Sequence, residues 1–205
     1  MRNPLALLSS VLTLAATAAL ALDTSTLQPW QITRLWSHSA SGYPGSHPYS
    51  RLSFEIREPN TVVVGETGFG AAAFAPSAVN CTVWWLGYAS VGESPRGWVN
   101  TCDEMDTRQG KWTFEVLEGT GGGLEWITAD FGLRVTLEEG VVLQTGGVLK
   151  VKFEGEAAFK VGENMAGACG ASGVCDWGLK AELVPVLVRQ RLVGLECVFG
   201  TCESA

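Results

Sequence analysis

The sequence predicts an all-β fold, a single-domain antiparallel β-barrel or sandwich stabilised by disulfides. The first observation is a hydrophobic period of two, clearest at residues 51–57, where Leu52, Phe54 and Ile56 alternate with polar residues. The second is that segments rich in glycine and proline, which favour turns, separate such runs. The third is an even number of cysteines, six, behind a leader-like N-terminus. No long amphipathic helical pattern competes with this interpretation.

Each predicted strand is a short run of alternating residues, or of β-branched and aromatic ones, bounded by turn-forming segments. In one such run Trp112, Phe114 and Val116 should face the core. Trp30 and Trp126 are also predicted core residues, with each indole N–H bonded to a partner. The predicted strands are residues 30–36, 51–57, 61–64, 81–86, 111–116, 131–137, 149–153, 157–161 and 179–188, and turn-rich segments include 37–50, 65–80, 118–123 and 144–147.

Residues 1–21 have the features of a cleaved signal peptide. Arg2 supplies a positive end, residues 5–20 are apolar, and Ala19-Leu20-Ala21 has the small-x-small pattern that precedes a cleavage site. An N-terminal membrane anchor is the alternative, but the stretch is short and has no basic flank on its far side. We therefore expect secretion, a β domain of residues 22–191, and a C-terminal tail of residues 192–205 with an extra cysteine pair.

The charge of the chain argues against nucleic acid and membranes as partners. The formal net charge is −7, and removal of Arg2 with the leader leaves 13 Lys and Arg against 21 Asp and Glu, a charge of −8. Such an acidic protein repels phosphate backbones and anionic lipid headgroups, and no basic stripe in the sequence offsets that charge. The remaining chain, about 184 residues, is long enough for one domain with a single core.

The cysteines are expected to form three disulfides. Fifteen connectivities are available to six cysteines. We expect pairing in sequence order, with a first bridge worth about 3 kcal/mol and a second worth about 2 kcal/mol in the chain-entropy model. A zinc site would need histidines at zinc-finger spacing, and both histidines lie in one distant loop, so we predict no metal site. The expected pairs are Cys81 with Cys102, Cys169 with Cys175, and Cys197 with Cys202.

The titratable residues form no recognisable catalytic set. His38 and His47 both fall in the loop 37–50, where a histidine is usually solvated. A glycosidase would need two carboxylates about 5 to 9 Å apart. We therefore predict no catalytic residues and no cofactor. The carboxylates considered for such a pair are Asp103, Glu104 and Asp106, or Glu154 and Glu156, the last two on one solvated strand face.

Three tryptophans and one asparagine are candidate surface residues. Trp84 and Trp85 are adjacent, so in a strand they point to opposite faces and one of them can be exposed. Together with Trp98 they form a candidate surface for stacking a sugar or binding a partner; the alternative is that neighbouring segments cover them. Asn80 begins the sequon Asn80-Cys81-Thr82 and is a candidate N-glycosylation site, with an unused sequon as the alternative.

Several short motifs follow one another in a distinctive order: Trp30-Gln31-Ile32, Leu52-Ser53-Phe54-Glu55-Ile56, Cys81, then 98–102 followed by Asp103-Glu104, and Cys169 with Gly173-Val174-Cys175. This order resembles the Alternaria major-allergen family of small secreted fungal β-barrel proteins, which includes hypersensitive-response elicitors. The resemblance implies a compact β-barrel, disulfides Cys81–Cys102 and Cys169–Cys175, and a role at the plant interface. The allergen forms a covalent dimer through a cysteine ahead of its opening Trp. Residues 22–29 contain no cysteine, so we expect no disulfide-linked dimer, whereas a non-covalent homodimer stays open.

Three functions of different classes remain open at this point. The first is a secreted fungal, non-enzymatic effector or elicitor-like protein that binds host components, or is recognised by the host, at the plant interface. The alternative is an extracellular carrier of a small apolar or phenolic ligand, and a third is a glycan-active hydrolase. The expected partner is accordingly a host plant protein or a small phenolic ligand.

Overall fold

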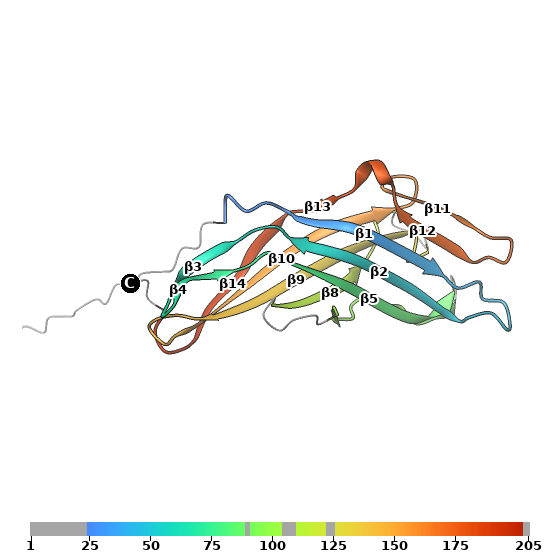
Figure 1. Ribbon diagram of the computed structural model, residues 1–205. Coiled ribbons are helices and arrows are strands. Elements are labelled where there is room, and N and C mark those ends of the chain that lie inside the picture. Colours follow the sequence, from blue (N-terminus) through green and yellow to red (C-terminus); the bar gives the residue numbers. More distant parts are fainter. Residues whose placement is uncertain (1–23, 89–90, 104–109, 122–125, 203–205) are drawn as a thin grey trace, which may run out of the picture.

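The computed structural model describes residues 24–88, 91–103, 110–121 and 126–202, which form a sandwich of two antiparallel sheets and a small hairpin (Figure 1). The seven-stranded sheet has the order β11-β12-β1-β2-β5-β6, with β13 pairing β1, and the five-stranded sheet has the order β14-β10-β9-β8-β7. The described residues do not close into a barrel, so the sandwich form of the prediction holds. The strands are β1 Trp30–Ser39, β2 Tyr49–Glu58, β3 Val62–Thr67, β4 Gly70–Phe74, β5 Ser77–Tyr88, β6 Val91–Gly92, β7 Asn100–Thr101, β8 Lys111–Leu117, β9 Asp130–Val142, β10 Val148–Lys160, β11 Met165–Cys169, β12 Cys175–Leu179, β13 Val186–Val188 and β14 Gln190–Phe199.

The core lies between the two sheets and is built by the alternation that the sequence shows. Leu52, Phe54 and Ile56 of β2 are buried, as predicted, and so are the inward residues of β8. Aromatic rings from opposite sheets meet there: Phe54 packs edge-on against Phe114, with ring centres 5.1 Å apart. The interior is therefore filled by side chains of both sheets.

Several sequence expectations need correction. The runs 149–153 and 157–161 belong to one strand, β10. Gly155 continues this strand between them, at a position where a Cβ atom would lie only 2.8 Å from Val188 Cγ1. The run 179–188 is not one strand: a 3₁₀ turn at Ala181–Leu183 follows the end of β12, and Pro185, which has no N–H to donate, precedes β13. Trp126 lies outside the strands and is 38 % exposed, because its segment forms the turn before β9.

The segment 192–205, expected to be a C-terminal tail, begins inside a sheet. Its residues 192–199 form most of β14, which pairs with β10 along the edge of the five-stranded sheet. Two register shifts interrupt that pairing, and such bulges are a common device for keeping an edge strand from pairing with another chain. The predicted signal peptide, residues 1–21, lies outside the described residues. Among the described residues, no helix is long and apolar enough to span a membrane.

All three disulfides join the cysteines in sequence order. Cys81 lies on β5 and Cys102 directly follows β7, so the first bridge ties one sheet of the sandwich to the other. The second bridge, Cys169–Cys175, joins directly paired residues of the β11–β12 hairpin. The third closes a short loop at the end of β14. Three disulfides are typical of extracellular proteins.

Besides Asp130, which accepts hydrogen bonds from the backbone N–H groups of Thr120 and Gly121, two carboxylic acids are buried. Glu58, at the end of β2, accepts hydrogen bonds from the Trp30 indole N–H at 2.7 Å and from the backbone N–H and side-chain amide of Asn60. Glu139 points inward from β9 and is 7 % exposed. Burial raises the pKa of Glu139 to about 8, and the negative charge of Glu58 adds to the increase. Glu58 is thus held by hydrogen bonds, whereas Glu139 stays protonated at neutral pH.

Candidate functional site

The strand register brings a row of planar side chains together on the outer face of the seven-stranded sheet. His38 of β1 lies opposite Asp176 of β12 and Arg51 of β2, and Arg51 in turn lies opposite Trp84 of β5. Trp36 stands two residues from His38 on the same face. All five side chains point away from the core because their strand neighbours point into it. Side chains from four strands therefore converge on one surface.

Arg51 lies between two tryptophans on this surface. The central carbon of its guanidinium group is 4.5 Å from the ring centre of Trp84 and 5.2 Å from that of Trp36. A cation over an indole ring is attracted by the negative face of the ring. The row continues from Trp84 to the His47 ring at 6.2 Å, and from His47 to the Tyr49 ring at 5.5 Å. Arg51 is thus held as the centre of an extended stack.

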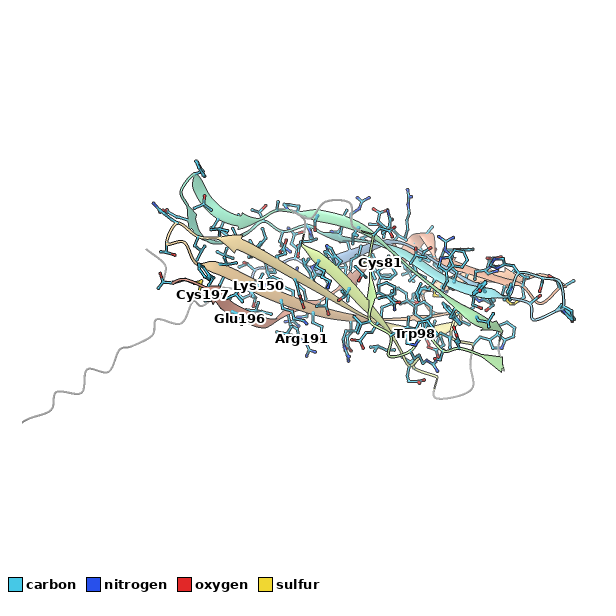
Figure 2. The ribbon with its side chains drawn as sticks, turned by 90° about the horizontal axis from the view of Figure 1, so that it is seen from below. Cys81, Trp98, Lys150, Arg191, Glu196 and Cys197 are labelled. Atoms are coloured by element: carbon cyan, nitrogen blue, oxygen red, sulfur yellow. A yellow bond between two sulfur atoms is a disulfide. The ribbon has the colours of Figure 1, made fainter. Side chains whose placement is uncertain are left out.

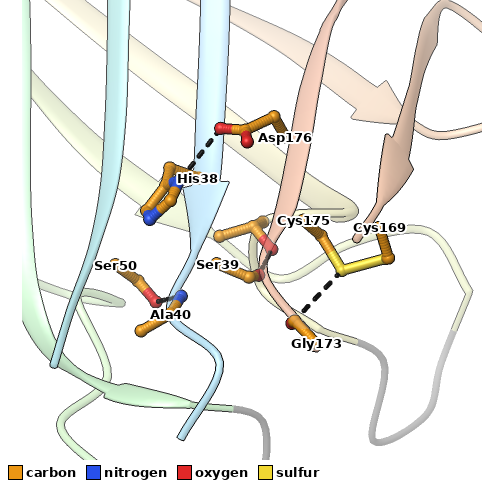
Figure 3. Close-up of a disulfide and its surroundings, with 9 residues drawn as sticks. His38, Ser39, Ala40, Ser50, Cys169, Gly173, Cys175 and Asp176 are labelled. Atoms are coloured by element: carbon orange, nitrogen blue, oxygen red, sulfur yellow. Dashed lines mark hydrogen bonds and ion pairs between the residues drawn. A yellow bond between two sulfur atoms is a disulfide. The ribbon is translucent and has the colours of Figure 1, made fainter. Parts of the chain in front are cut away.

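The other end of the row is fixed by a hydrogen bond between His38 and Asp176. The His38 ring stacks on Trp36, with centres 5.6 Å apart, and its Nδ1–H donates to the Asp176 carboxylate at 2.8 Å. Figure 3 shows His38 reaching from β1 toward Asp176 on β12, beside the Cys169–Cys175 disulfide of the β11–β12 hairpin. We call the set Asp176, His38, Trp36, Arg51, Trp84, His47 and Tyr49 the aromatic ladder.

A groove of about 380 Å³ opens beside the aromatic ladder, over β1, β2 and β5. Ser53 and Thr82, which are cross-strand partners, stand on its floor with hydroxyl groups directed outward. Asp103 borders it from the segment after β7, and its backbone N–H donates to the Asn80 carbonyl at 2.8 Å. The groove therefore combines aromatic, cationic and hydroxyl groups. The side chains that line it on the outer face, here called the ladder groove, are Arg34, Trp36, Arg51, Ser53, Asn80, Thr82 and Asp103.

A second groove, of about 450 Å³, lies on the outer face of the five-stranded sheet. Three lysines border it, and Gly140 and Gly194 leave its floor without side chains. The Lys152 ammonium pairs with Glu138 at 2.9 Å, and this contact lowers the pKa of Glu138. Lys150 lies opposite Glu196 on the paired strand, at the same end of the molecule in Figure 2. The charge of Lys152 is thus compensated by Glu138, whereas Arg51 in the ladder groove has no carboxylate within 4 Å among the described residues.

Of the tryptophans predicted to form one surface, Trp84 and Trp98 are exposed and Trp85 is buried. Trp84 is 49 % exposed and Trp85 is 4 % exposed, so the prediction that they point to opposite faces is confirmed. Trp98 is 39 % exposed in the loop before β7, and no ring contact joins it to Trp84 within the ranges described. Asn80 is exposed on the ladder face, one residue from Cys81. Of the predicted surface, Trp84 and Asn80 belong to the ladder side of the sheet and Trp85 belongs to the core.

The carboxylates considered for catalysis lie in different places. Glu154 and Glu156 share the outer face of β10, as expected, where Glu156 accepts from the Arg134 Nε–H at 2.8 Å. Arg191 contacts Glu154 from β14. Asp103 borders the ladder groove, whereas 104 and 106 lie outside the described residues. The described part of the chain contains no group of three or more His, Cys, Asp or Glu residues that could hold a metal.

Sequence reasoning missed Trp36 and Arg51 as site residues. The alternation in β1 and β2 gives their outward direction, but a bulge between Ile32 and Arg34 shifts the phase of β1. The pairing of β2 with β5, which places Trp84 opposite Arg51, joins residues that are distant in sequence. The alternation of β2 indicated that Arg51 points outward. It did not indicate that Trp36 and Trp84 lie beside it.

The fold and the site define a class: a disulfide-bridged, extracellular-type β-sandwich with an aromatic and cationic groove on one outer face. Comparison with known proteins adds no relative, since no family model, no curated protein and no solved structure matches the chain. The resemblance to the Alternaria major-allergen family therefore rests on the sequence motifs given above.

Proposed function

We propose that this protein is a secreted, non-enzymatic effector or elicitor-like protein of a fungus that acts at the plant interface by binding a host component through the ladder groove. The leader-like residues 1–21, the motif order shared with the allergen family and the three disulfides support an extracellular role. The observation that carries the binding site is the half-exposed Trp84 ring, 4.5 Å from the guanidinium carbon of Arg51, which lines the groove.

Such a surface is suited to recognition because its groups are already held in place. Stacking on both sides restricts the Arg51 side chain, so less conformational entropy is lost when a partner binds. Tryptophan and arginine are also the residues most enriched among those that dominate binding energy. A carrier that holds its ligand inside the barrel would need a hollow interior. Here the interior is filled by core rings, as the contact between Phe54 and Phe114 illustrates. A small ligand of this protein would therefore bind at an outer groove.

The test compares two tryptophan variants in the plant. Purified protein, Trp84→Ala and Trp98→Ala are infiltrated into leaves of several species, and ion leakage and the oxidative burst are recorded. Trp98 is the matched control, because it is similarly exposed but lies outside the aromatic ladder. Binding of the three proteins to washed leaf cell-wall and apoplastic fractions is measured in parallel by depletion from solution.

We expect Trp84→Ala to lose both the response and the binding, and Trp98→Ala to retain both. Equal behaviour of the two variants would remove the ladder groove as the contact site. A wild-type protein that neither binds any fraction nor elicits a response in any species would overturn the proposal itself. Near-ultraviolet circular dichroism confirms that each variant is folded before it is tested.

A further inference from the structure

We propose that the ladder groove binds a carboxylate-bearing sugar, that is, a short oligosaccharide of uronic acids. This inference rests on the proposed function and names the ligand class of the same site. In the proposed complex, a sugar ring packs against the solvent-exposed part of the Trp84 ring, which is 49 % exposed, while its carboxylate accepts hydrogen bonds from the Arg51 guanidinium group.

The first support is the uncompensated charge of Arg51. Several other arginines contact a carboxylate at 4 Å or less: Arg34, Arg57, Arg96, Arg134 and Arg191. Among the described residues no carboxylate stands within that distance of Arg51, and its Nε–H is buried without a hydrogen-bond partner. On a protein of net charge −7, a buried donor on an unpaired cation is a group that an anionic ligand would satisfy.

The second support is the geometry of the guanidinium group. Its central carbon lies over the rings of Trp36 and Trp84, and contacts with ring faces do not use the N–H groups as hydrogen-bond donors to an anion. Arginine donates two parallel hydrogen bonds to a carboxylate from these groups. The tryptophans therefore orient Arg51 for a planar anion instead of neutralising it.

The third support is the polar lining of the ladder groove. Ser53 and Thr82 present hydroxyls, Asn80 presents an amide, and Asp103 presents a carboxylate that can accept from ligand hydroxyls. An apolar ligand would leave these groups unsatisfied. A polyphosphate chain has no hydroxyl groups to donate to Asp103 or to pair with the groove hydroxyls. A uronic acid unit, with one carboxylate among several hydroxyls, satisfies all of them.

The position of the groove favours a sugar over a peptide strand. An extended peptide binds by adding to a free sheet edge, where backbone groups are unpaired. The ladder groove lies over the outer face of β1, β2 and β5, where β2 pairs with β1 on one side and with β5 on the other, so the backbone of β2 on its floor is already paired. The volume of about 380 Å³ falls within the range of small-ligand sites and suits a short oligosaccharide.

The experiment is isothermal titration of the folded protein with trigalacturonate at low ionic strength. The matched ligand is the same trisaccharide with its carboxylates methyl-esterified, and maltotriose serves as a neutral sugar. The variants are Arg51→Gln and Trp84→Ala. The controls are Lys150→Gln, which removes a cation from the lysine-bordered groove of the other sheet, and Trp98→Ala.

We expect the wild type and both controls to bind trigalacturonate, with affinity falling as salt is added. Esterification or Arg51→Gln should weaken binding by about ten- to a hundredfold, since a hydrogen-bonded charge is lost. If the wild type binds the methyl ester as tightly as trigalacturonate, Arg51 does not bind the carboxylate. A loss of trigalacturonate affinity in Lys150→Gln would show that the anion binds on the other sheet. Absence of binding by the wild type would also overturn the inference.

The two proposals fail separately. If Trp84→Ala and Arg51→Gln abolish binding to host material but no acidic sugar binds the wild type, the proposed function stands and the ligand class is wrong. If neither variant changes binding to host material, the site itself is wrong and the inference falls with it.

Discussion

The buried acid Glu139 should make the stability of the protein depend on pH over the neutral range. It lies on the inward face of β9, directly opposite the buried Val151 of β10. Burial, with the nearby Glu58, raises its pKa from the ordinary value of 4.5 to about 8. The substitution Glu139→Gln keeps the shape of the side chain and removes its ability to ionise.

The sign of the effect follows from which state holds the proton. Below about pH 4.5 the acid is protonated in both the folded and the unfolded chain, so it contributes no pH dependence. As pH rises, the unfolded chain releases this proton first, and the folded state loses stability up to about pH 8. At about 1.4 kcal/mol per pH unit the full difference is about 5 kcal/mol, and residual hydration of the carboxyl lowers the expected change to about 2 to 4 kcal/mol.

The assay is guanidinium unfolding of disulfide-intact protein, followed by tryptophan fluorescence at several pH values between about 5 and 8.5. We expect Glu139→Gln and the wild type to unfold within about 1 kcal/mol of each other at the acidic end. At the alkaline end the variant should be more stable by about 2 to 4 kcal/mol. All other titrating groups are common to both proteins, so the difference between them isolates Glu139.

The neighbouring residue supplies the control. Glu138 points to solvent, and the hydrogen bond from Lys152 lowers its pKa. The contribution of Glu138 to stability is fully present above the pKa that it has in the unfolded chain, and it is lost only as pH falls through the lower pKa of the folded state. The difference in stability between Glu138→Gln and the wild type should therefore stay constant over the assay range. A difference for Glu139→Gln that is equally constant, within about 0.5 kcal/mol, would refute the assignment of a buried protonated acid.

Three further predictions concern the core, the first disulfide and the sequon. Phe114→Ala should lower the free energy of unfolding by about 3 to 5 kcal/mol, because the ring is 1 % exposed and packs on Phe54; a loss below about 1 kcal/mol in chemical denaturation would contradict this packing. Joint replacement of Cys81 and Cys102 by alanine opens a loop with a sequence separation of 21 and should cost about 3 kcal/mol in the same assay, whereas unchanged stability would speak against the chain-entropy account. A glycan on Asn80 should weaken ligand binding to the ladder groove about tenfold or more, and equal affinities before and after enzymatic deglycosylation would place the ligand elsewhere.

Alternation was sufficient to predict much of the fold. The alternating run 51–57 fixes both the strand and the inward face of β2, because a strand with one wet face must bury the other. The same rule predicts that Trp84 and Trp85 diverge. It would also have predicted an inward Glu139, since that residue continues the phase of the buried Leu137, but a polar residue in a core position ended the predicted strand.

The rest depended on contacts that local pattern does not contain. Proline and glycine have more than one meaning in a strand: Pro185 interrupts the predicted run 179–188, whereas Gly155 sits inside β10 because Val188 packs closely against it. The aromatic ladder depends on the register of β1, β2, β5 and β12, which is set by the bulge in β1 and by pairings across long stretches of chain. Composition showed an excess of tryptophan without showing which indole meets Arg51.

The first disulfide connects the stability of the fold to the geometry of the ladder groove. Asn80 and Asp103, which border the groove, directly adjoin Cys81 and Cys102, and the backbone hydrogen bond between them lies beside the bridge. The two residues belong to opposite sheets, so the disulfide holds the Asp103 side of the groove against β5. Reduction should therefore detach that side even where the core of the sandwich persists. Activity that requires the oxidised protein would then report the integrity of the groove as well as of the fold, and the two are separated by measuring whether the reduced, alkylated protein retains its near-ultraviolet circular dichroism.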